Sequence, residues 1–174
     1  MDTDEEKEFA WAREEMGSLL ERVRSCVLAT VSSSGRPLSS YAPVCRDGRG
    51  SFLVYVSAMA KHYGHLRRSS LASLSLIEDE SVAENLFARK RLTVDCSAKL
   101  VKRESDEWVA GVAGLVARHG STMEYLRDLV DFDLFCLTPE EGRLVLGFGK
   151  AYRVFGDGLS EISYLGAGGH RSKS

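Results

Sequence analysis

Long apolar runs, a signal-like N-terminus and a large excess of charge are all missing from this sequence. No stretch approaches the roughly 20 apolar residues of a membrane-spanning helix, and the first six residues are acidic where a secretion signal would be basic. The 23 basic residues nearly balance the 25 acidic ones, which leaves a net charge of -2. We therefore expect a cytoplasmic protein that has no bulk attraction to nucleic acid or to an anionic membrane.

Paired cysteines and the common catalytic motifs are also absent. There is no C-x-x-C pair to chelate zinc, so buried thiols are expected at Cys26, Cys45, Cys96 and Cys136. The sequence has no phosphate-binding loop, no dinucleotide fingerprint before a helix, no H-E-x-x-H and no G-x-S-x-G. The absence of these motifs argues against the P-loop, Rossmann, zinc-protease and serine-hydrolase classes of protein.

The composition and length fit one soluble domain. Of the 174 residues, 44% are apolar and 28% are charged, which is typical of a globular protein. Apolar residues recur at helical spacing from Phe9 to Val23, so we expect an N-terminal helix over about residues 4–24. A barrel is expected over about residues 25–155, followed by a flexible C-terminal tail over about residues 156–174.

Short alternating segments separated by glycine-containing turns predict six or seven antiparallel strands. The connections are too short for parallel crossovers, and closure into a barrel would remove exposed edges. We expect an α+β, mainly β fold with flanking helices. Near the C-terminus, the turn residues Pro139–Gly142 should separate a strand over Phe132–Leu137 from one over Arg143–Val154. Glycines 147 and 149 in the latter indicate a bulge or a close approach of the backbone to a ligand.

His170 follows Gly166-Ala167-Gly168-Gly169, a segment too flexible to hold a histidine in a packed core by itself. One interpretation is a frayed end with an incidental histidine. The other is a metal ligand, since neutral imidazole commonly binds metals.

Two further segments could bind an anion. Residues 57–62 follow a strand and open a helix, so backbone amides, the Ser57 hydroxyl, Lys61 and His62 could meet a phosphate or carboxylate. Alternatively, Ser57 only caps the helix. Arg89-Lys90-Arg91 is a compact basic run that is either a solvated face or a cofactor contact. Arg91 is the better candidate for that contact because Lys90 should point to the opposite face.

Asp131 and Asp133 bracket Phe132 at the entry to a strand and share a face. A turn carboxylate is the common interpretation. If His170 binds a metal, however, its second ring nitrogen needs an acceptor, for which a carboxylate is usual. Spacing does not distinguish between the two aspartates.

Several motifs together resemble a known family. In the segments Leu28–Val31, Gly35–Pro37 and Ser40–Pro43, the chain resembles the pyridoxamine-phosphate-oxidase-like split-barrel family. In Ala88–Thr93, Gly147–Tyr152 and Gly169–Arg171, the chain resembles one branch of that family, the haem-utilisation proteins of the HutZ and HugZ type.

The resemblance implies a homodimer of split barrels with haem between the protomers, degraded with oxygen and an unidentified reductant. His170 would be the axial ligand of the haem iron and Asp131 the carboxylate that accepts a hydrogen bond from it. Arg91 and His62 would be cationic residues near the cofactor.

The resemblance also implies cofactor contacts at Ser57 and Lys61, where the wider family holds flavin phosphate, and on the second strand at Ser40 and Tyr41. Flavin members commonly carry an arginine where Ser40 stands, which weakens the interpretation as a flavin protein. We expect a haem-degrading enzyme of iron acquisition. The alternatives are a haem carrier or storage protein and an FMN-dependent oxidoreductase.

Overall fold

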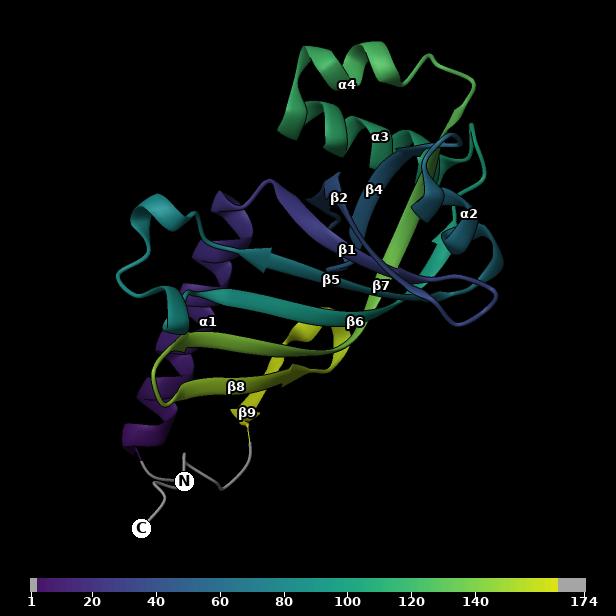
Figure 1. The fold of residues 1–174 in the computed structure, drawn as a ribbon. Coiled ribbons are helices and arrows are strands. Elements are labelled where there is room, and N and C mark those ends of the chain that lie inside the picture. Colours follow the sequence, from purple (N-terminus) through teal and green to yellow (C-terminus); the bar gives the residue numbers. More distant parts are fainter. Residues whose placement is uncertain (1–2, 166–174) are drawn as a thin grey trace.

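One antiparallel sheet forms the body of the protein, in a computed structural model that describes residues 3–165 (Figure 1). Its strand order is β2-β1-β5-β6-β7-β4-β3, and β8 and β9 continue from the second half of β7. The strands are β1 (Ser25–Val31), β2 (Pro37–Pro43), β3 (Cys45–Arg46), β4 (Phe52–Ser57), β5 (Leu71–Ile77), β6 (Arg91–Leu100), β7 (Phe132–Gly147), β8 (Lys150–Phe155) and β9 (Glu161–Tyr164). The curled, mainly antiparallel sheet confirms the predicted split barrel. The described residues contain nine strands rather than six or seven.

The additional strands are the two-residue strand β3 and β9. The long strand β7 differs from the prediction in its length instead. It pairs with β6 along its length, with β4 through its first half and with β8 through its second. The predicted turn at Pro139–Gly142 is wrong, because this segment stays in the strand. Glu140 is the extra residue of a bulge opposite Asp95 and Cys96. Pro139 lies between the end of β4 and the start of β8, where its missing N–H breaks no pairing.

The chain turns instead at Phe148 and Gly149, between β7 and β8. Gly149 has a φ of 71°, a left-handed conformation that favours glycine. The register also shifts between Val145 and Gly147, which confirms the predicted bulge at these glycines.

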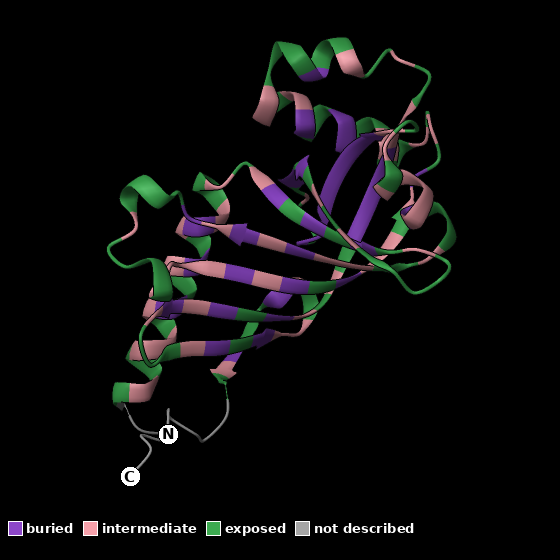
Figure 2. Ribbon diagram, viewed as in Figure 1, coloured by how far each residue is buried: buried purple, intermediate pink, exposed green. Residues whose placement is uncertain are grey.

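Helices cover the sheet in two places. The N-terminal helix α1 (Thr3–Arg22) buries Ala12, Met16 and Leu19 against the main core, and its bounds are close to those predicted. A second core lies under α3 (Asp106–His119) and α4 (Ser121–Leu126), and Ser105 caps α3. Buried and exposed residues alternate along most strands (Figure 2), as expected for a sheet that buries one face.

The remaining helical elements are short connections. They are α2 (Lys61–Arg68), η1 (Glu80–Val82), η2 (Leu86–Ala88) and η3 (Asp157–Leu159). None of the helices in residues 3–165 is long and apolar enough to cross a membrane. All four cysteines are buried and free, as predicted, and burial raises the pKa of the Cys26 and Cys96 thiols to about 12.

Structure continues past residue 156, where we predicted the tail to begin. Leu159 and Ile162 are buried, and β9 pairs with β8. Helix α1 holds this strand, because the Glu8 carboxylate accepts hydrogen bonds from the hydroxyls of Tyr152 and Tyr164, each at 2.7 Å. The barrel therefore extends to Tyr164. His170 lies outside the described residues.

Candidate functional site

Ser57 and Asp131 meet where β4 ends and β7 begins. The Ser57 hydroxyl lies 3.4 Å from the Asp131 carboxylate, and the Ala58 amide donates to the Asp131 carbonyl at 2.7 Å. The Met59 amide donates to the Ser57 hydroxyl at 3.2 Å. These contacts bring together two predicted site residues that are 74 positions apart in the sequence.

The N-terminus of α2 stays open beside this pair. Ala60 occupies the N-cap position, and no side chain accepts a hydrogen bond there. The interpretation of Ser57 as the helix cap is therefore wrong. Free amides at a helix N-terminus, followed by the exposed Lys61 and the half-buried His62, suit an anionic group.

The two aspartates that spacing left equivalent differ in their partners. Asp133 accepts a hydrogen bond from the Tyr63 hydroxyl at 2.6 Å, and this contact raises the pKa of Tyr63. Asp131 is exposed, and within the described residues its carboxylate has only the long contact with Ser57. Asp131 is therefore the carboxylate that is available to accept a hydrogen bond from a ligand or from the imidazole of a histidine.

His62 is tuned by its surroundings. Burial lowers its pKa, and the nearby His65 lowers it further. His65 itself packs inward, with Nδ1 at 3.0 Å from the hydroxyl of the buried Thr30. A neutral His62 is therefore favoured near pH 7, where it can donate or accept a hydrogen bond.

Arg103 holds the segment that leads to Asp131, and the sequence analysis missed it. One terminal nitrogen donates to the Tyr55 hydroxyl at 3.1 Å and to the carbonyls of Leu129 at 2.7 Å and Phe132 at 2.9 Å. The other terminal nitrogen donates to the Arg127 carbonyl at 3.3 Å. No local pattern marks Arg103, because its partners come from two distant segments.

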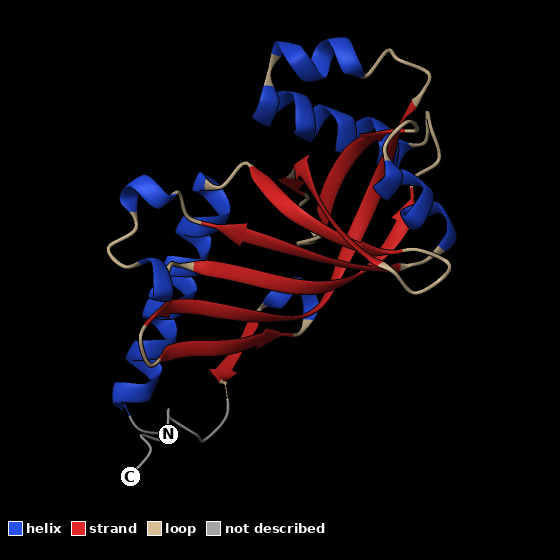
Figure 3. Ribbon diagram, viewed as in Figure 1, coloured by secondary structure: helices blue, strands red, loops and turns tan. Residues whose placement is uncertain are grey.

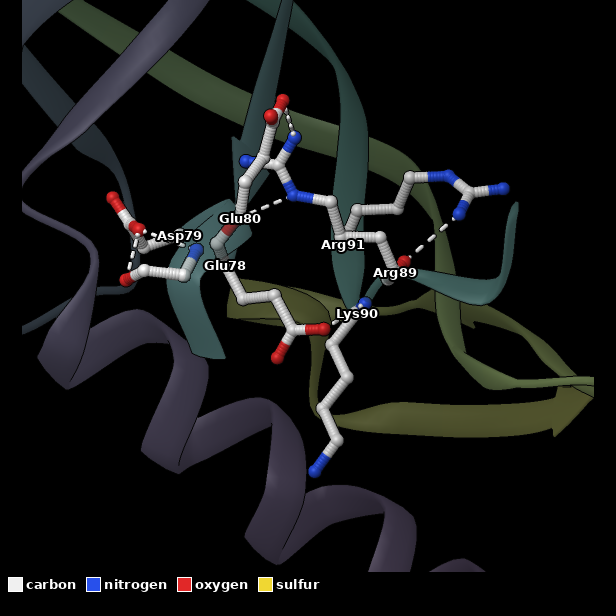
Figure 4. A network of polar contacts seen from close by, with 7 residues as sticks. Glu78, Asp79, Glu80, Arg89, Lys90 and Arg91 are labelled. Atoms are coloured by element: carbon white, nitrogen blue, oxygen red, sulfur yellow. Dashed lines mark hydrogen bonds and ion pairs between the residues drawn. The ribbon is translucent and has the colours of Figure 1, made fainter. Parts of the chain in front are cut away.

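The basic run at residues 89–91 divides into structural and available cations (Figure 4). Arg89 donates to the Glu78 carbonyl at 2.6 Å and pairs with Glu80 at 2.8 Å. Lys90 pairs with Glu15 of α1 at 2.5 Å. Arg89 thus ties the connection between β5 and β6 together internally, and Lys90 fastens it to α1.

Arg91 extends away from Lys90, as the strand pattern predicted (Figure 4). Within residues 3–165 its guanidinium contacts the Arg89 carbonyl at 2.8 Å and forms no ion pair. Arg91 is therefore free to meet an anion.

Tyr41 lies on the same face of the sheet as Arg91. Tyr41 pairs with Val27, Val27 with Ser75, and Ser75 with Thr93, two residues after Arg91. Val27 and Leu71 are also exposed on this outer face, and Tyr41 is 66% exposed.

Ser40 points to the inner face of the barrel instead. Its hydroxyl donates to the Leu28 carbonyl across the strand pair at 2.9 Å. The structure therefore does not bring Ser40 to the face that carries Tyr41 and Arg91.

The predicted site residues thus form two separate groups. The first, at the junction of β4, β7 and α2, consists of Ser57, Lys61, His62 and Asp131. The second, on the outer face, consists of Tyr41 and Arg91. Arg91 pairs with Val145, so about 40 Å of β7 separates the two groups at the ordinary rise of a strand. One protomer alone does not assemble them.

Comparison with known proteins matches most of the barrel. The pyridoxamine 5'-phosphate oxidase family matches residues 12–146. The chain is 45% identical over 147 residues to the heme oxygenase HutZ of Vibrio cholerae, covering 84% of this chain and 82% of that protein.

This chain belongs to the pyridoxamine 5'-phosphate oxidase family. Within that family it belongs to the haem-utilisation branch that includes HutZ. Solved structures agree with this assignment. A crystal structure of HutZ from Vibrio cholerae, described as a heme storage protein, matches with a TM-score of 0.72 and 38% identity over 78% of this chain and 94% of that one. Campylobacter jejuni ChuZ matches with a TM-score of 0.84 and 25% identity over 95% of this chain and 66% of that one.

As a member of this family, the chain shows one departure that affects its ligands. The second strand presents Ser40 inward, with its hydroxyl already bonded, so no cation stands there to meet a flavin phosphate. The described residues also hold no cluster of three or more metal-ligating side chains.

Proposed function

We propose that this protein binds haem between the two subunits of a homodimer and degrades it oxidatively, releasing iron for use. His170 would be the axial ligand of the haem iron, with Asp131 of the partner subunit accepting a hydrogen bond from its imidazole. The observation that carries the proposal is the separation of the two groups of site residues within one protomer, because each group is incomplete alone.

The point where the chain leaves the barrel supports this arrangement. The Leu165 amide donates to the Ala151 carbonyl at 3.0 Å, and Ala151 pairs with Val145, which pairs with Arg91. The chain therefore leaves the sheet in the same cross-strand row as Arg91. Five residues lead from Leu165 to His170 and span at most about 18 Å. Arg91 is within that reach, but Asp131 of the same protomer is not.

The residues of the chain have distinct tasks in this proposal. The Asp131 carboxylate would hold the second ring N–H of the partner subunit's His170, which orients the imidazole and raises its basicity. Arg91 of one protomer, together with Lys61 and the open N-terminus of α2 from the other protomer, would bind the haem propionates. Haem would supply the oxygen chemistry, and an unidentified reductant would supply electrons.

The residues present fit haem. A propionate needs a cation without a competing carboxylate, which Arg91 provides within residues 3–165. An imidazole needs an acceptor with free lone pairs, which Asp131 provides and Asp133 does not.

Haemin titration tests the ligand and its acceptor. The purified protein should give a Soret band that shifts in His170→Ala and Asp131→Asn. Asp133→Asn is the matched control, and its Soret band should resemble that of the wild type. Identical spectra in the wild type and His170→Ala would exclude His170 as the ligand.

Turnover is tested separately. Ascorbate in air should bleach the Soret band and release iron, which a ferrous chelator would measure. If the Soret band persists, the protein is a haem carrier or storage protein, as one description of HutZ suggests.

A flavin-dependent oxidoreductase is the other candidate, favoured by the open N-terminus of α2, which would suit the phosphate of FMN near Ser57 and Lys61, with Arg91 supplied by the other protomer. A yellow protein that contains FMN as purified would support it. A colourless protein that takes up haemin would exclude it as the main function.

A further inference from the structure

A cavity of about 520 Å³ lies between α1, α3 and the strands β3 and β4. The C-terminal ends of the two helices face each other there, because Arg24 donates to the Arg118 carbonyl and Arg118 donates back to the end of α1 (Figure 1). The walls include Leu20, Val23 and Phe52. None of the residues in the two groups described above lines this cavity.

Arg118 places an uncompensated positive charge in its wall. One terminal nitrogen of Arg118 donates to the carbonyls of Leu20 at 2.9 Å, Glu21 at 3.0 Å and Val23 at 2.8 Å. Its Nε is buried and has no hydrogen-bond partner. No carboxylate of residues 3–165 forms an ion pair with this guanidinium. The side chain as a whole is half-buried, and a half-buried guanidinium without a counter-ion can bind an anionic ligand.

Arg46 adds a second cation on the strand side of the cavity. Its guanidinium donates to the backbone carbonyls of Gly50 and Gly158, and no carboxylate in the described part of the chain pairs with it. Glu21 also lines the cavity and, like Arg46, is exposed, so one carboxylate stands against the two guanidinium groups. The polar side of the cavity is therefore net positive, while the rest of the wall is apolar.

Two glycines that line the cavity, one in each helix, are not required by close packing against neighbouring residues. A Cβ added to Gly17, inside α1, would meet no atom within 4 Å, and one added to Gly114, inside α3, would make an ordinary contact with Cys45 at 3.6 Å. Gly111 is different, because a Cβ there would lie 2.8 Å from Leu134. Glycine disfavours a helix interior, yet packing explains it only at Gly111. Gly17 and Gly114 are exposed residues that line the cavity, where side chains would project into its space.

We propose that this cavity binds a monocarboxylate with an apolar body, with the carboxylate at Arg118 and Arg46 and the body along Leu20 and Val23. The site is separate from the haem site, so its occupancy does not depend on whether the protein degrades haem. A cavity of this size is in the range that takes small organic ligands.

Thermal unfolding with decanoate as the probe tests the proposal. Decanoate should raise the melting temperature of the wild type in a concentration-dependent manner, because it binds the folded state. Decyltrimethylammonium and decan-1-ol, of similar chain length, should not raise it. An equal rise with all three compounds would show that no cationic site selects the carboxylate and would overturn the proposal.

Filling the cavity gives a second test. Gly17→Leu should fold and weaken decanoate binding, measured by calorimetry, by roughly tenfold or more, since its side chain occupies the ligand volume. Gly17→Ala is the matched control and should keep most of the affinity. If Gly17→Leu does not fold, Gly114→Leu fills the same space from α3.

Haemin titration of the same variants separates this site from the haem site. Both Gly17 variants should give the Soret band of the wild type. Undiminished decanoate binding in the leucine variants would overturn the proposal, whatever the haemin titration shows.

Discussion

Arg103 shows how a single side chain prepares the site without belonging to it. Its guanidinium joins the Tyr55 hydroxyl to carbonyls at residues 127, 129 and 132. It also lies over the ring of Trp108, 5.2 Å from the ring centroid. Asp131 lies within the segment that these contacts hold, so the position of its carboxylate depends on Arg103.

Replacing Arg103 should therefore affect both stability and haem binding. We expect Arg103→Ala to lower the free energy of unfolding by about 2–4 kcal/mol, because several hydrogen bonds to a charged donor are lost together. Urea denaturation measures this loss, and haemin titration should show an altered Soret band. Arg127→Ala, at an exposed arginine in the same segment, should change stability by less than about 0.5 kcal/mol. Equal losses in the two variants would contradict this role of Arg103.

At the scale of elements, the two faces of α3 impose different requirements on its glycines. Gly111 faces Leu134 of β7 and Leu53 of β4, and a Cβ would lie 2.8 Å and 3.1 Å from their methyl groups. Gly111→Ala should therefore cost about 1–3 kcal/mol through overpacking. Gly114→Ala in the same helix should instead gain up to about 1 kcal/mol from helix propensity. Chemical denaturation of both variants tests the contrast, which fails if they change stability in the same direction.

The contact of α1 with β8 and β9 should make stability depend on pH. Hydrogen bonds from Tyr152, and then from Tyr164, lower the pKa of Glu8 below its ordinary value of 4.5. Since the folded state binds this proton less readily than the unfolded state, the contribution is complete above pH 4.5 and is lost as the pH falls through the lowered value.

Glu8→Gln tests this pH dependence. It should be less stable than the wild type at pH 6, and the difference should shrink below pH 4.5. Glu14→Gln, exposed on the same helix, should show no such convergence. A difference between the wild type and Glu8→Gln that stays constant from pH 6 to pH 3 would show that the carboxylate charge does not matter.

At the scale of the whole molecule, the proposed haem site is complete only when two subunits associate. If His170 of one subunit meets Asp131 of its partner, mixed dimers of His170→Ala and Asp131→Asn contain one intact site. Random association of equal amounts should then restore about a quarter of the wild-type sites. Each variant alone should have none.

Haem bleaching by the mixture, after unfolding and refolding the two variants together, measures this complementation. A mixture no more active than its components would favour a site built within one chain. Size-exclusion chromatography with light scattering confirms that the variants are dimers before the comparison is made.

Local sequence patterns determined much of the fold. The N-terminal helix, predicted over about residues 4–24, is observed over Thr3–Arg22, because helical periodicity depends on neighbouring residues. The turn predicted at Pro139–Gly142 was wrong for the converse reason. The turn-forming residues there form a β-bulge instead. Whether such residues form a turn or a bulge depends on the strands that pair with β7 on either side.

The sequence by itself determined which residues have the chemistry for the site: the cation Arg91, the carboxylates at 131 and 133, and the tethered His170. The tertiary structure alone distinguished Asp131 from Asp133, released Arg91 from the ion pairs that hold its two neighbours, and placed Arg91 and Asp131 far apart. These outcomes depend on contacts between segments distant in the sequence, which spacing does not encode. For the same reason, the glycine-lined cavity between α1 and α3 became visible only once the two helices were packed together.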